Sequence, residues 1–393
     1  MNILFVYERI IIPTFGGLER VTSLLAHEMS ARGNRVCYLS IGPEVRDSDS
    51  DGRIPQHFLP IAEMTEGDFN ARFEELVRTL RIDVVIFQGN SPEIVKALKA
   101  PLKEIKKLAV IHFQPFPLLG KERYIKSLTP DSDLRPKGRI LKRLALVAPA
   151  IYRKIYMRQK GALYSDMVRN VDRLVLLSSF FIPRIIENCE SANEQNVKAI
   201  NNPLTFQPER IDNDGVKENL VLFVSRMYNP QKNITGFIDV WSRFSKMHPE
   251  WKAIAIGDGE HLQMARSYSS KKGVRNLQFV GSVDNVEHYY AKAKIYCMTS
   301  TYEGWGMVLT EAMAHEVVPV AFDSFEAVHD IISDGEDGLL VKAFDVEAMA
   351  MTLSALASDE RTRKKMAQRA RNKVSRFKVD AIVDKWLALF SDL

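Results

Sequence analysis

Apolar and polar positions follow two patterns along the chain: short apolar runs, and longer segments with apolar residues at helical spacing. The first half opens with the run NILFVYE (2–8), continues with the helix-like segment LERVTSLLAHEMSARG (18–33), and returns to an apolar run at NRVCYLSIG (34–42). Similar runs, separated by helix-like stretches, recur at 83–90, 107–114, 172–180 and 197–203. Strands that alternate with helices predict a parallel sheet covered by helices on both faces.

The same pattern restarts in the second half of the chain. Further apolar runs lie at 219–227, 251–259, 276–283, 294–300 and 317–323. Between the two series, residues 201–219 are polar and rich in turn formers, so we place a domain junction there. A length of 393 residues suits two domains. The fold class predicted is α/β, with two doubly wound parallel-sheet domains whose strand ends would face a shared cleft.

Composition is that of a soluble globular protein. No apolar run reaches the length of about 18 residues that a membrane-spanning helix needs, and the N-terminal residues do not resemble a signal peptide. The three cysteines, Cys37, Cys189 and Cys297, lie far apart and lack metal-ligand spacing. We therefore expect a cytoplasmic protein without disulfides or structural zinc.

Charge changes this picture in one region. Residues 99–160 hold 16 Lys and Arg against 4 Asp and Glu, a local net charge of +12 in a chain whose total is +5. Basic and apolar side chains alternate through 135–164, as in an interfacial helix attracted to anionic lipid, and Pro149 should interrupt that helix. The alternative is a solvated helix face over a buried apolar stripe. No nucleic-acid module accompanies the charge, so nucleic acid is not an expected partner.

The stretch TSTYEGWGMVLTEAMA (299–314) carries the most specific candidate chemistry. Glu303 and Glu311 are separated by seven residues, and glycines flank Trp305. Because MVLTEAMA favours a helix, Glu303 should lie just ahead of a helix N-terminus and Glu311 about two turns inside it. The free N–H groups of such a terminus suit a phosphate. The carboxylates would then bind something attached to the phosphate, and a hydroxyl-rich sugar is the obvious candidate.

Other candidates follow predicted strands. Arg226 and Lys232, in SRMYNPQKN, could hold a diphosphate and stabilise its charge as a bond breaks, although such side chains in a loop are usually solvated. Gly257, in IGDGE, could let the backbone approach a ligand or simply form a tight turn.

In the first half, Gly16 and Gly17 could admit a phosphate or an acceptor at a helix N-terminus. Their loop is not G-x-G-x-x-G, which weighs against a dehydrogenase. His112 ends a predicted strand and is either a hydrogen-bonded core histidine or a polar group facing a reacting sugar.

Together these motifs resemble the retaining nucleotide-sugar glycosyltransferases of family 4, which have the GT-B architecture. The resemblance is strongest over 220–345, where FVSRM, QKN, GDGE, FVGSV, the Glu303–Glu311 motif, VPVAFDS and DGEDGLLV follow in the family's order. It implies a Rossmann-like acceptor-binding domain at 1–205 and a Rossmann-like donor-binding domain at 206–375. It also implies that the last helix, 376–393, packs back on the first domain.

The resemblance also implies roles. Arg226 and Lys232 would bind the donor's diphosphate, Glu311 the ribose hydroxyls, and Glu303 hydroxyls of the donor sugar. His112 would lie near the anomeric side of that sugar. The remaining donor-binding candidates are Gly16, Gly17, Gly257, Val283 beside the base, and the backbone of Gly304, Trp305, Gly306 and Met307.

The implied function is sugar transfer with retention, from a nucleotide diphosphate donor, expected to be a UDP-sugar, to a lipid-linked or other saccharide. The product would belong to a cell-surface polysaccharide or glycan. A polyprenyl-diphosphate-linked acceptor is one option, and the protein would sit peripherally on the inner face of the cell membrane. No Asp-x-Asp pair lies within 220–345, so we expect no metal and no cofactor.

Two alternatives stay open: a sugar-nucleotide epimerase of the same architecture and a non-catalytic nucleotide-sugar-binding subunit. One departure from the family is Glu316, which stands where a glycine is usual. If that position has positive φ, the turn is strained or rebuilt.

Overall fold

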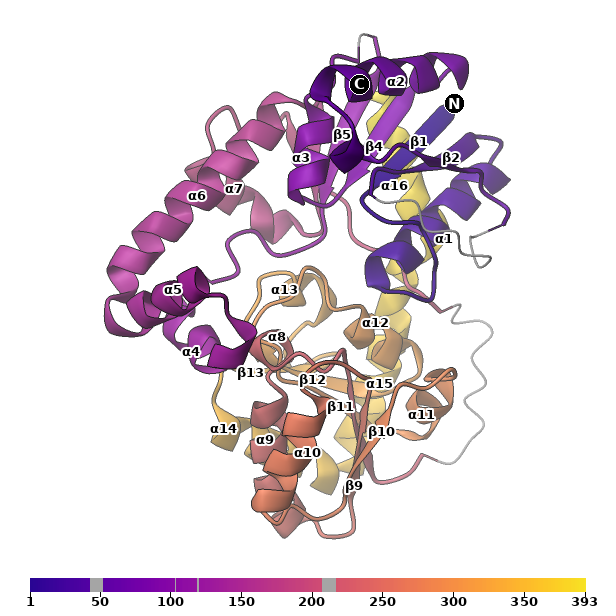
Figure 1. The fold of residues 1–393 in the computed structure, drawn as a ribbon. Helices are drawn as coiled ribbons and strands as arrows, with labels where there is room; N and C mark the ends of the chain where they lie inside the picture. The colour runs from indigo at the N-terminus through magenta and orange to yellow at the C-terminus, as the bar shows by residue number, and fades with distance from the viewer. Residues whose placement is uncertain (43–51, 103, 119, 207–216) are drawn as a thin grey trace. The chain divides into compact units, whose positions relative to one another are not determined.

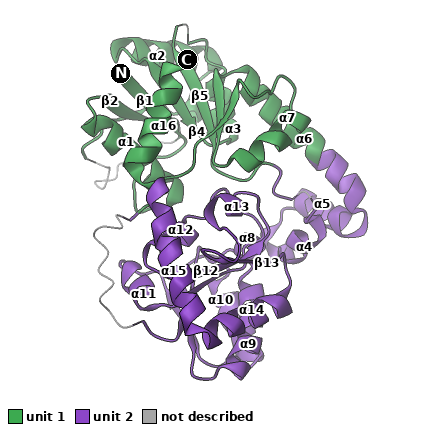
Figure 2. Cartoon of the chain, turned by 180° about the vertical axis from the view of Figure 1, so that it is seen from behind, with its two compact units in different colours: residues 1–115, 157–205, 377–393 green, residues 116–156, 206–376 purple. Residues whose placement is uncertain are grey.

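The computed structural model describes residues 1–42, 52–102, 104–118, 120–206 and 217–393, and strands and helices alternate through them (Figure 1). The middle of the predicted domain junction, 207–216, lies outside the described residues. The chain divides into two compact units (Figure 2). Unit 1 comprises residues 1–115, 157–205 and 377–393, and unit 2 comprises residues 116–156 and 206–376.

Unit 1 is built on a parallel sheet with the order β3-β2-β1-β4-β5-β6-β7. Its strands are β1 (Asn2–Tyr7), β2 (Arg35–Ser40), β3 (Gln56–Phe58), β4 (Val84–Gln88), β5 (Lys106–Ile111), β6 (Arg173–Leu176) and β7 (Val197–Ala199). The strand order reverses between β1 and β4, which creates a switch point where ligands of such sheets bind, at the carboxyl ends of the strands.

The helices of unit 1 include one from the end of the chain. They are α1 (Gly17–Ala31), α2 (Glu66–Thr79), α3 (Pro92–Leu98), α7 (Ile182–Asn188), α16 (Val379–Ser391) and most of α6 (Pro149–Arg169). The guanidinium of Arg32, at the end of α1, contacts the carboxylate of Asp384 and donates to the carbonyl of Asp380 at 2.9 Å. The C-terminal helix therefore packs within unit 1.

Unit 2 repeats the design with a parallel sheet in the order β10-β9-β8-β11-β12-β13. Its strands are β8 (Leu220–Val224), β9 (Lys252–Ile256), β10 (Leu277–Gly281), β11 (Ile295–Met298), β12 (Val318–Asp323) and β13 (Leu339–Lys342). Its switch point lies between β8 and β11. The longer helices are α5 (Pro136–Val147), α9 (Ile234–Met247), α10 (Leu262–Lys271), α12 (Met307–Ala314), α14 (Val346–Ser358) and α15 (Glu360–Val374). The shorter ones are α4 (Glu122–Ser127), α8 (Asn229–Lys232), α11 (Glu287–Lys292) and α13 (Val328–Ile331).

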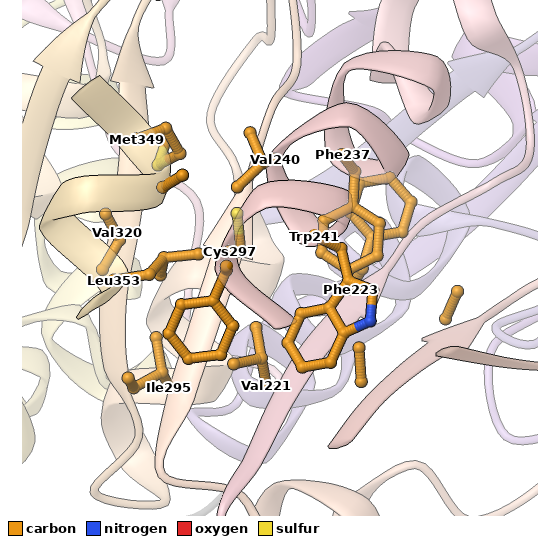
Figure 3. Close-up of a cluster of buried hydrophobic side chains, with 14 of the residues drawn as sticks. Val221, Phe223, Phe237, Val240, Trp241, Ile295, Cys297, Val320, Met349 and Leu353 are labelled. Carbon is orange, nitrogen blue, oxygen red and sulfur yellow. The ribbon is translucent and has the colours of Figure 1, made fainter. Parts of the chain in front are cut away.

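The core of unit 2 shows why these sequences form these elements. Alternate strand residues point to one face of the sheet, where they meet α9 and α14 (Figure 3). Phe223 of β8 stacks on Phe237 of α9 with ring centroids 4.6 Å apart. The indole N–H of the fully buried Trp241 donates to the carbonyl of Arg275 at 2.8 Å, so its one polar atom is satisfied.

The predicted fold class, two Rossmann-like parallel-sheet domains, is confirmed. Pro149 interrupts the basic segment as expected, because α5 ends at Val147 and α6 begins at Pro149. One grouping differs from the sequence-based division at residue 205. Residues 116–156, which carry α4 and α5, pack with unit 2 although the chain reaches them between β5 and β6 of unit 1.

Candidate active site

The switch point of the unit 2 sheet gathers the main candidate residues. The chain leaves β8 through Arg226 and forms α8, whose last residue is Lys232. It leaves β11, the neighbouring strand, and reaches Glu303 five residues later. Carboxyl ends of adjacent parallel strands meet at one edge of the sheet, so both loops lie where doubly wound sheets bind ligands.

Lys232 and Glu303 are in direct contact. The Lys232 Nζ lies 2.6 Å from Glu303 Oε1, and the side chains are only 17% and 8% exposed. Gln231 Nε2 donates to the other carboxylate oxygen at 3.2 Å. A buried carboxylate needs such partners. The pair therefore fixes one positive and one negative group at the edge of the sheet.

Threonines hold the two loops against each other. Thr301 N donates to the carbonyl of Gln231 and its Oγ1 to the carbonyl of Pro230, both at 2.7 Å. Thr299 Oγ1 donates to the carbonyl of Asn233 at 3.0 Å. These hydrogen bonds hold the loop of Glu303 against α8 and the residue that follows it. They involve only groups of the protein, so they need no bound ligand.

Arg226 lies in the loop between β8 and α8, six residues before Lys232. Its side chain is exposed, with the guanidinium carbon 5.2 Å from the ring centroid of Tyr228. Burial raises the pKa of Tyr302 to about 12, and the charge of Arg226 acts in the opposite direction. The charge of Arg226 therefore acts electrostatically on Tyr302, which lies in the loop that carries Glu303.

Gly257 is required by close approach of two loops. Its φ is +126°, and a Cβ built there would lie 1.9 Å from the carbonyl oxygen of Ser225. Its N–H donates to the carbonyl of Gly281 at 2.8 Å. Val283 lies two residues after Gly281 and is partly buried. Gly257 thus lets the loop after β9 pack against the loop after β8. Its hydrogen bond to Gly281 connects that loop to the segment of Val283, the residue expected to lie beside the base of the donor.

The helix that follows Glu303 begins at Met307, where the run MVLTEAMA predicted it. Gly306 has φ +97° and caps α12, which starts at Met307, so Glu311 is the fifth helical residue. The expected depth of two turns is wrong, because the fifth residue of a helix with 3.6 residues per turn lies only about one turn inside it. Its side chain is 4% exposed, and Tyr290 donates a hydrogen bond to its Oε2 at 3.2 Å. Gly304 and Trp305 are buried in the preceding turn.

Glu316 is strained as its departure from the family suggested. Its φ is +55°, in the left-handed region that favours glycine. Its carboxylate compensates in part by pairing with Arg371 at 2.9 Å. The turn is therefore kept rather than rebuilt.

In unit 1, Gly16 caps α1 with an extended backbone, and Gly17 is the first helical residue. A Cβ at Gly16 would lie 2.7 Å from a carboxylate oxygen of Glu19, so a larger residue there would require the Glu19 side chain to move. The neighbouring Phe15 is 60% exposed.

His112 follows β5 in the same unit. Its Nε2 hydrogen-bonds Gln88 Oε1, at the end of β4. An amide oxygen only accepts, so Nε2 carries the proton and Nδ1 stays an acceptor. Desolvation lowers the pKa of His112 to about 4, which keeps the ring neutral at ordinary pH. Phe113, the next residue, is 50% exposed.

The structure brings part of the predicted set together. Arg226, Lys232 and Glu303 share the switch point of unit 2, with Gly257 and Glu311 in the adjoining loop and helix. His112, Gly16 and Gly17 belong to unit 1. Sequence reasoning missed Gln231 and Tyr290, the partners of the two glutamates. Gln231 adjoins Lys232 in the motif, which was a usable signal; Tyr290 had none. No cluster of potential metal ligands occurs in the part of the chain that the structure describes.

The basic segment has both structural and exposed charges. Lys142 donates to Asp131 at 2.7 Å, and Arg153 binds Glu122 at 2.6 Å. Burial raises the pKa of Glu122, but hydrogen bonds from Arg153 and the Gly120 N–H outweigh it, so the net pKa is lowered. By contrast, apolar side chains on α5 and early α6 reach solvent. They are Ile140, Val147 and Ile151, which are 67%, 81% and 57% exposed. Within the described residues, no helix is long and apolar enough to cross a membrane.

Comparison with known proteins agrees with the geometry. Residues 207–373 match the family described as Glycosyl transferases group 1. An α-1,4-N-acetyl-D-galactosaminyltransferase of Campylobacter jejuni, whose full name includes diNAcBac-PP-undecaprenol, is 33% identical over 201 residues. The match covers 51% of this chain and 55% of that protein, so the chain spans about half the length of this relative.

Two further likenesses extend over the whole chain. An uncharacterized glycosyltransferase of Haemophilus influenzae is 22% identical over 95% of this chain and 96% of its own. HepE of Anabaena, solved in complex with UDP and glucose, superposes with a TM-score of 0.72 at 16% identity, covering 100% of this chain and 99% of its own. The structural likeness shows the fold.

The two parallel sheets and the whole-chain likeness define a two-unit α/β protein with the GT-B fold. Residues 207–373 match the group 1 glycosyl transferases, which supports the glycosyltransferase resemblance drawn from the motifs.

Proposed function

We propose that the protein is a retaining glycosyltransferase. It moves a sugar from a nucleoside diphosphate donor, expected to be a UDP-sugar, to a saccharide carried on a lipid, such as a polyprenyl diphosphate. The observation that carries this proposal is the 2.6 Å contact of Lys232 with Glu303 at the switch point of unit 2, inside the region that matches the family.

The proposed chemistry follows from the charges at this edge. Lys232 and Arg226 neutralise the diphosphate as the bond between the anomeric carbon and the phosphate oxygen breaks. The acceptor oxygen bonds to the anomeric carbon on the same face, and its proton passes to the departing phosphate. Glu303 holds donor-sugar hydroxyls, and Glu311, fixed by Tyr290, receives hydrogen bonds from the ribose. Two cations serve the diphosphate, so the proposal requires no metal or cofactor.

Named relatives support the substrate classes. The Campylobacter relative is named for a GalNAc-bearing PP-undecaprenol compound, and HepE was solved with UDP and glucose. In unit 1, the neutral His112 would lie near the anomeric centre. The exposed rings of Phe15 and Phe113 offer faces that stack against sugars of the acceptor.

The lipid half of the proposal rests on α5 and the start of α6. Exposed Ile140, Val147 and Ile151 argue against the alternative of a buried apolar stripe. The exposed basic residues around them include Lys137, Arg139, Arg143, Lys154 and Arg158. Apolar side chains that insert among cations suit the surface of an anionic bilayer. The protein would thus act peripherally on the inner face of the cell membrane.

Nucleotide titration tests the donor site first. UDP, GDP, ADP and CMP are titrated calorimetrically and by thermal shift, where a ligand at 100 times its Kd adds about 2.7 kcal/mol of stability. Binding of one nucleoside diphosphate selects the sugar donors to assay. NMR of the product then distinguishes retention from inversion. Release of a free epimerised sugar nucleotide would point instead to an epimerase, and binding without turnover to a non-catalytic subunit.

A further inference from the structure

Residues 120–156, here called the anchor segment, belong to unit 2 and contact the rest of that unit through polar side chains. The segment contains α4, α5 and the beginning of α6 and groups with unit 2, as Figure 2 shows. Three of its side chains, Lys121, Tyr124 and Asp133, each reach a loop that carries a candidate donor-site residue. None of the three stands in a sequence motif of the family.

Lys121 holds the loop after β11. Its ammonium donates to the carbonyl of Thr301 at 2.9 Å and also to the carbonyl of Ser324. Thr301 lies two residues before Glu303, and Ser324 follows β12. One cation therefore joins the loop of Glu303 to the loop of the neighbouring strand through hydrogen bonds from a charged donor, the stronger kind.

Tyr124 holds the end of α8. Its hydroxyl accepts a hydrogen bond from Asn233 Nδ2 at 3.1 Å, and Asn233 directly follows Lys232. Asn233 has φ +50° and also caps α9 through its Oδ1. The Tyr124 ring stacks on Phe344 with centroids 3.9 Å apart, so the hydroxyl is held in place by packing.

Asp133 holds the loop after β9. Its Oδ2 lies 3.0 Å from Nε2 of His261, which is 4% exposed. The Nδ1 of His261 accepts from the backbone N–H of Asn229 at 3.4 Å, so Nε2 carries the proton and donates to Asp133. His261 thereby links the Gly257 loop to the start of α8.

We propose that Lys121, Tyr124 and Asp133 are positioning residues of the donor site. They touch no donor themselves and act by fixing the loops of Glu303, Lys232 and Gly257. The proposal deepens the proposed function and rests on it. Its physical basis is that mobile loops would have to be ordered when the donor binds, whereas loops already fixed by the anchor segment avoid that loss of entropy.

Hydrogen–deuterium exchange of the unliganded protein tests the positioning directly. Lys121→Met keeps the aliphatic chain and removes the ammonium. We expect faster exchange across 299–306 and unchanged exchange in the strands of unit 1. Arg123→Gln, an exposed change on the same helix, is the matched control. Equal exchange of 299–306 in Lys121→Met and wild type would overturn the proposal.

Donor kinetics provide a second readout that general destabilisation would not mimic. Tyr124→Phe keeps the stacked ring and removes only the acceptor, and Asp133→Ala removes the acceptor of His261. Each should raise the donor Kd and KM about tenfold, ~1.4 kcal/mol, with kcat nearly unchanged. Asp133→Asn, which keeps an acceptor oxygen, should restore a wild-type KM.

The two proposals fail in different ways. Unchanged donor Kd in both Tyr124→Phe and Asp133→Ala, or no rescue by Asp133→Asn, would overturn the positioning role while leaving the proposed function intact. If wild-type protein binds no nucleoside diphosphate, the proposed function fails, and the exchange experiment still decides whether the anchor segment orders the loops.

Discussion

Units 1 and 2 place candidate residues after neighbouring strands of similar parallel sheets, yet they hold them differently. In unit 2, Glu303 is bound by Lys232 and Gln231, and its loop is tied to α8 by threonines. In unit 1, His112 is held by Gln88, and the adjacent Phe113 is half exposed. The match to the group 1 glycosyl transferases also lies in unit 2, at residues 207–373. Under the proposed function, the donor would be bound by charged, tightly held groups in unit 2, and the acceptor by fewer fixed groups in unit 1.

The largest expected effect is the loss of transfer activity on substitution of Glu303, which is compared with the loss on substitution of His112. Glu303→Gln keeps the shape but removes the charge that orients Lys232, and we expect transfer activity to fall about a thousandfold, ~4 kcal/mol in the barrier. His112→Asn removes one neutral contact and should cost about tenfold. Both are measured as kcat/KM with a fixed donor and acceptor. A larger loss for His112→Asn would reverse the proposed division between the units.

Lys232→Met tests the pairing itself. It leaves the carboxylate of Glu303, 8% exposed, without its cation, and we expect unfolding free energy to fall by about 3 kcal/mol. The double variant with Glu303→Gln should recover most of that stability, because the buried charge is gone, and should still bind the nucleoside diphosphate poorly.

Denaturant titrations of the four proteins give the coupling energy. A double variant no more stable than Lys232→Met would mean that the loss arises from packing rather than charge. This cycle also separates effects on binding from effects on stability, which Lys232→Met alone confounds.

Acid should act on both units through desolvated histidines, the partly buried His112 and the buried His315. Burial lowers the pKa of His112 in unit 1 and of His315 in unit 2 from 6.5 to about 4. Lys217 and Arg371 add to the effect on His315. Because each folded pKa lies below the unfolded value, this stability is complete above pH 6.5, is lost progressively as the pH falls from 6.5, and is gone below about pH 4.

We expect each histidine to account for about 2 kcal/mol of the stability lost between pH 7.5 and pH 4.5. Denaturant unfolding at the two pH values, repeated on His112→Gln and His315→Gln, measures each contribution. Each variant should be less sensitive to acid than wild type. Identical acid sensitivity in a variant would show that its histidine titrates normally.

Sequence patterns anticipated the elements and placed Lys232 and Glu303 after strands of one doubly wound sheet. They did not predict the direct contact of the two side chains. They placed the start of α12 correctly at Met307 but misjudged the depth of Glu311, which is one turn inside the helix rather than two. They could not assign the anchor segment. The contact of Lys121 with Thr301 spans 180 residues, and nothing local in either stretch marks it.

The smallest effect concerns a strained turn in unit 2. Glu316 has φ +55°, where a non-glycine residue costs about 1–2 kcal/mol, and its partly exposed pair with Arg371 returns ~0–1 kcal/mol. Glu316→Gly relieves the strain and loses the pair, whereas Glu316→Ala loses the pair and keeps the strain. We expect the glycine variant to be more stable than the alanine variant by about 1 kcal/mol in denaturant unfolding. Equal stabilities would mean that the backbone relaxes at this turn.

Activity should be unchanged in both variants of Glu316, because the turn follows α12 and lies beyond Glu303 and Glu311 in the chain. A loss of activity confined to the alanine variant would instead tie the strain at Glu316 to the placement of Glu311 in the donor site.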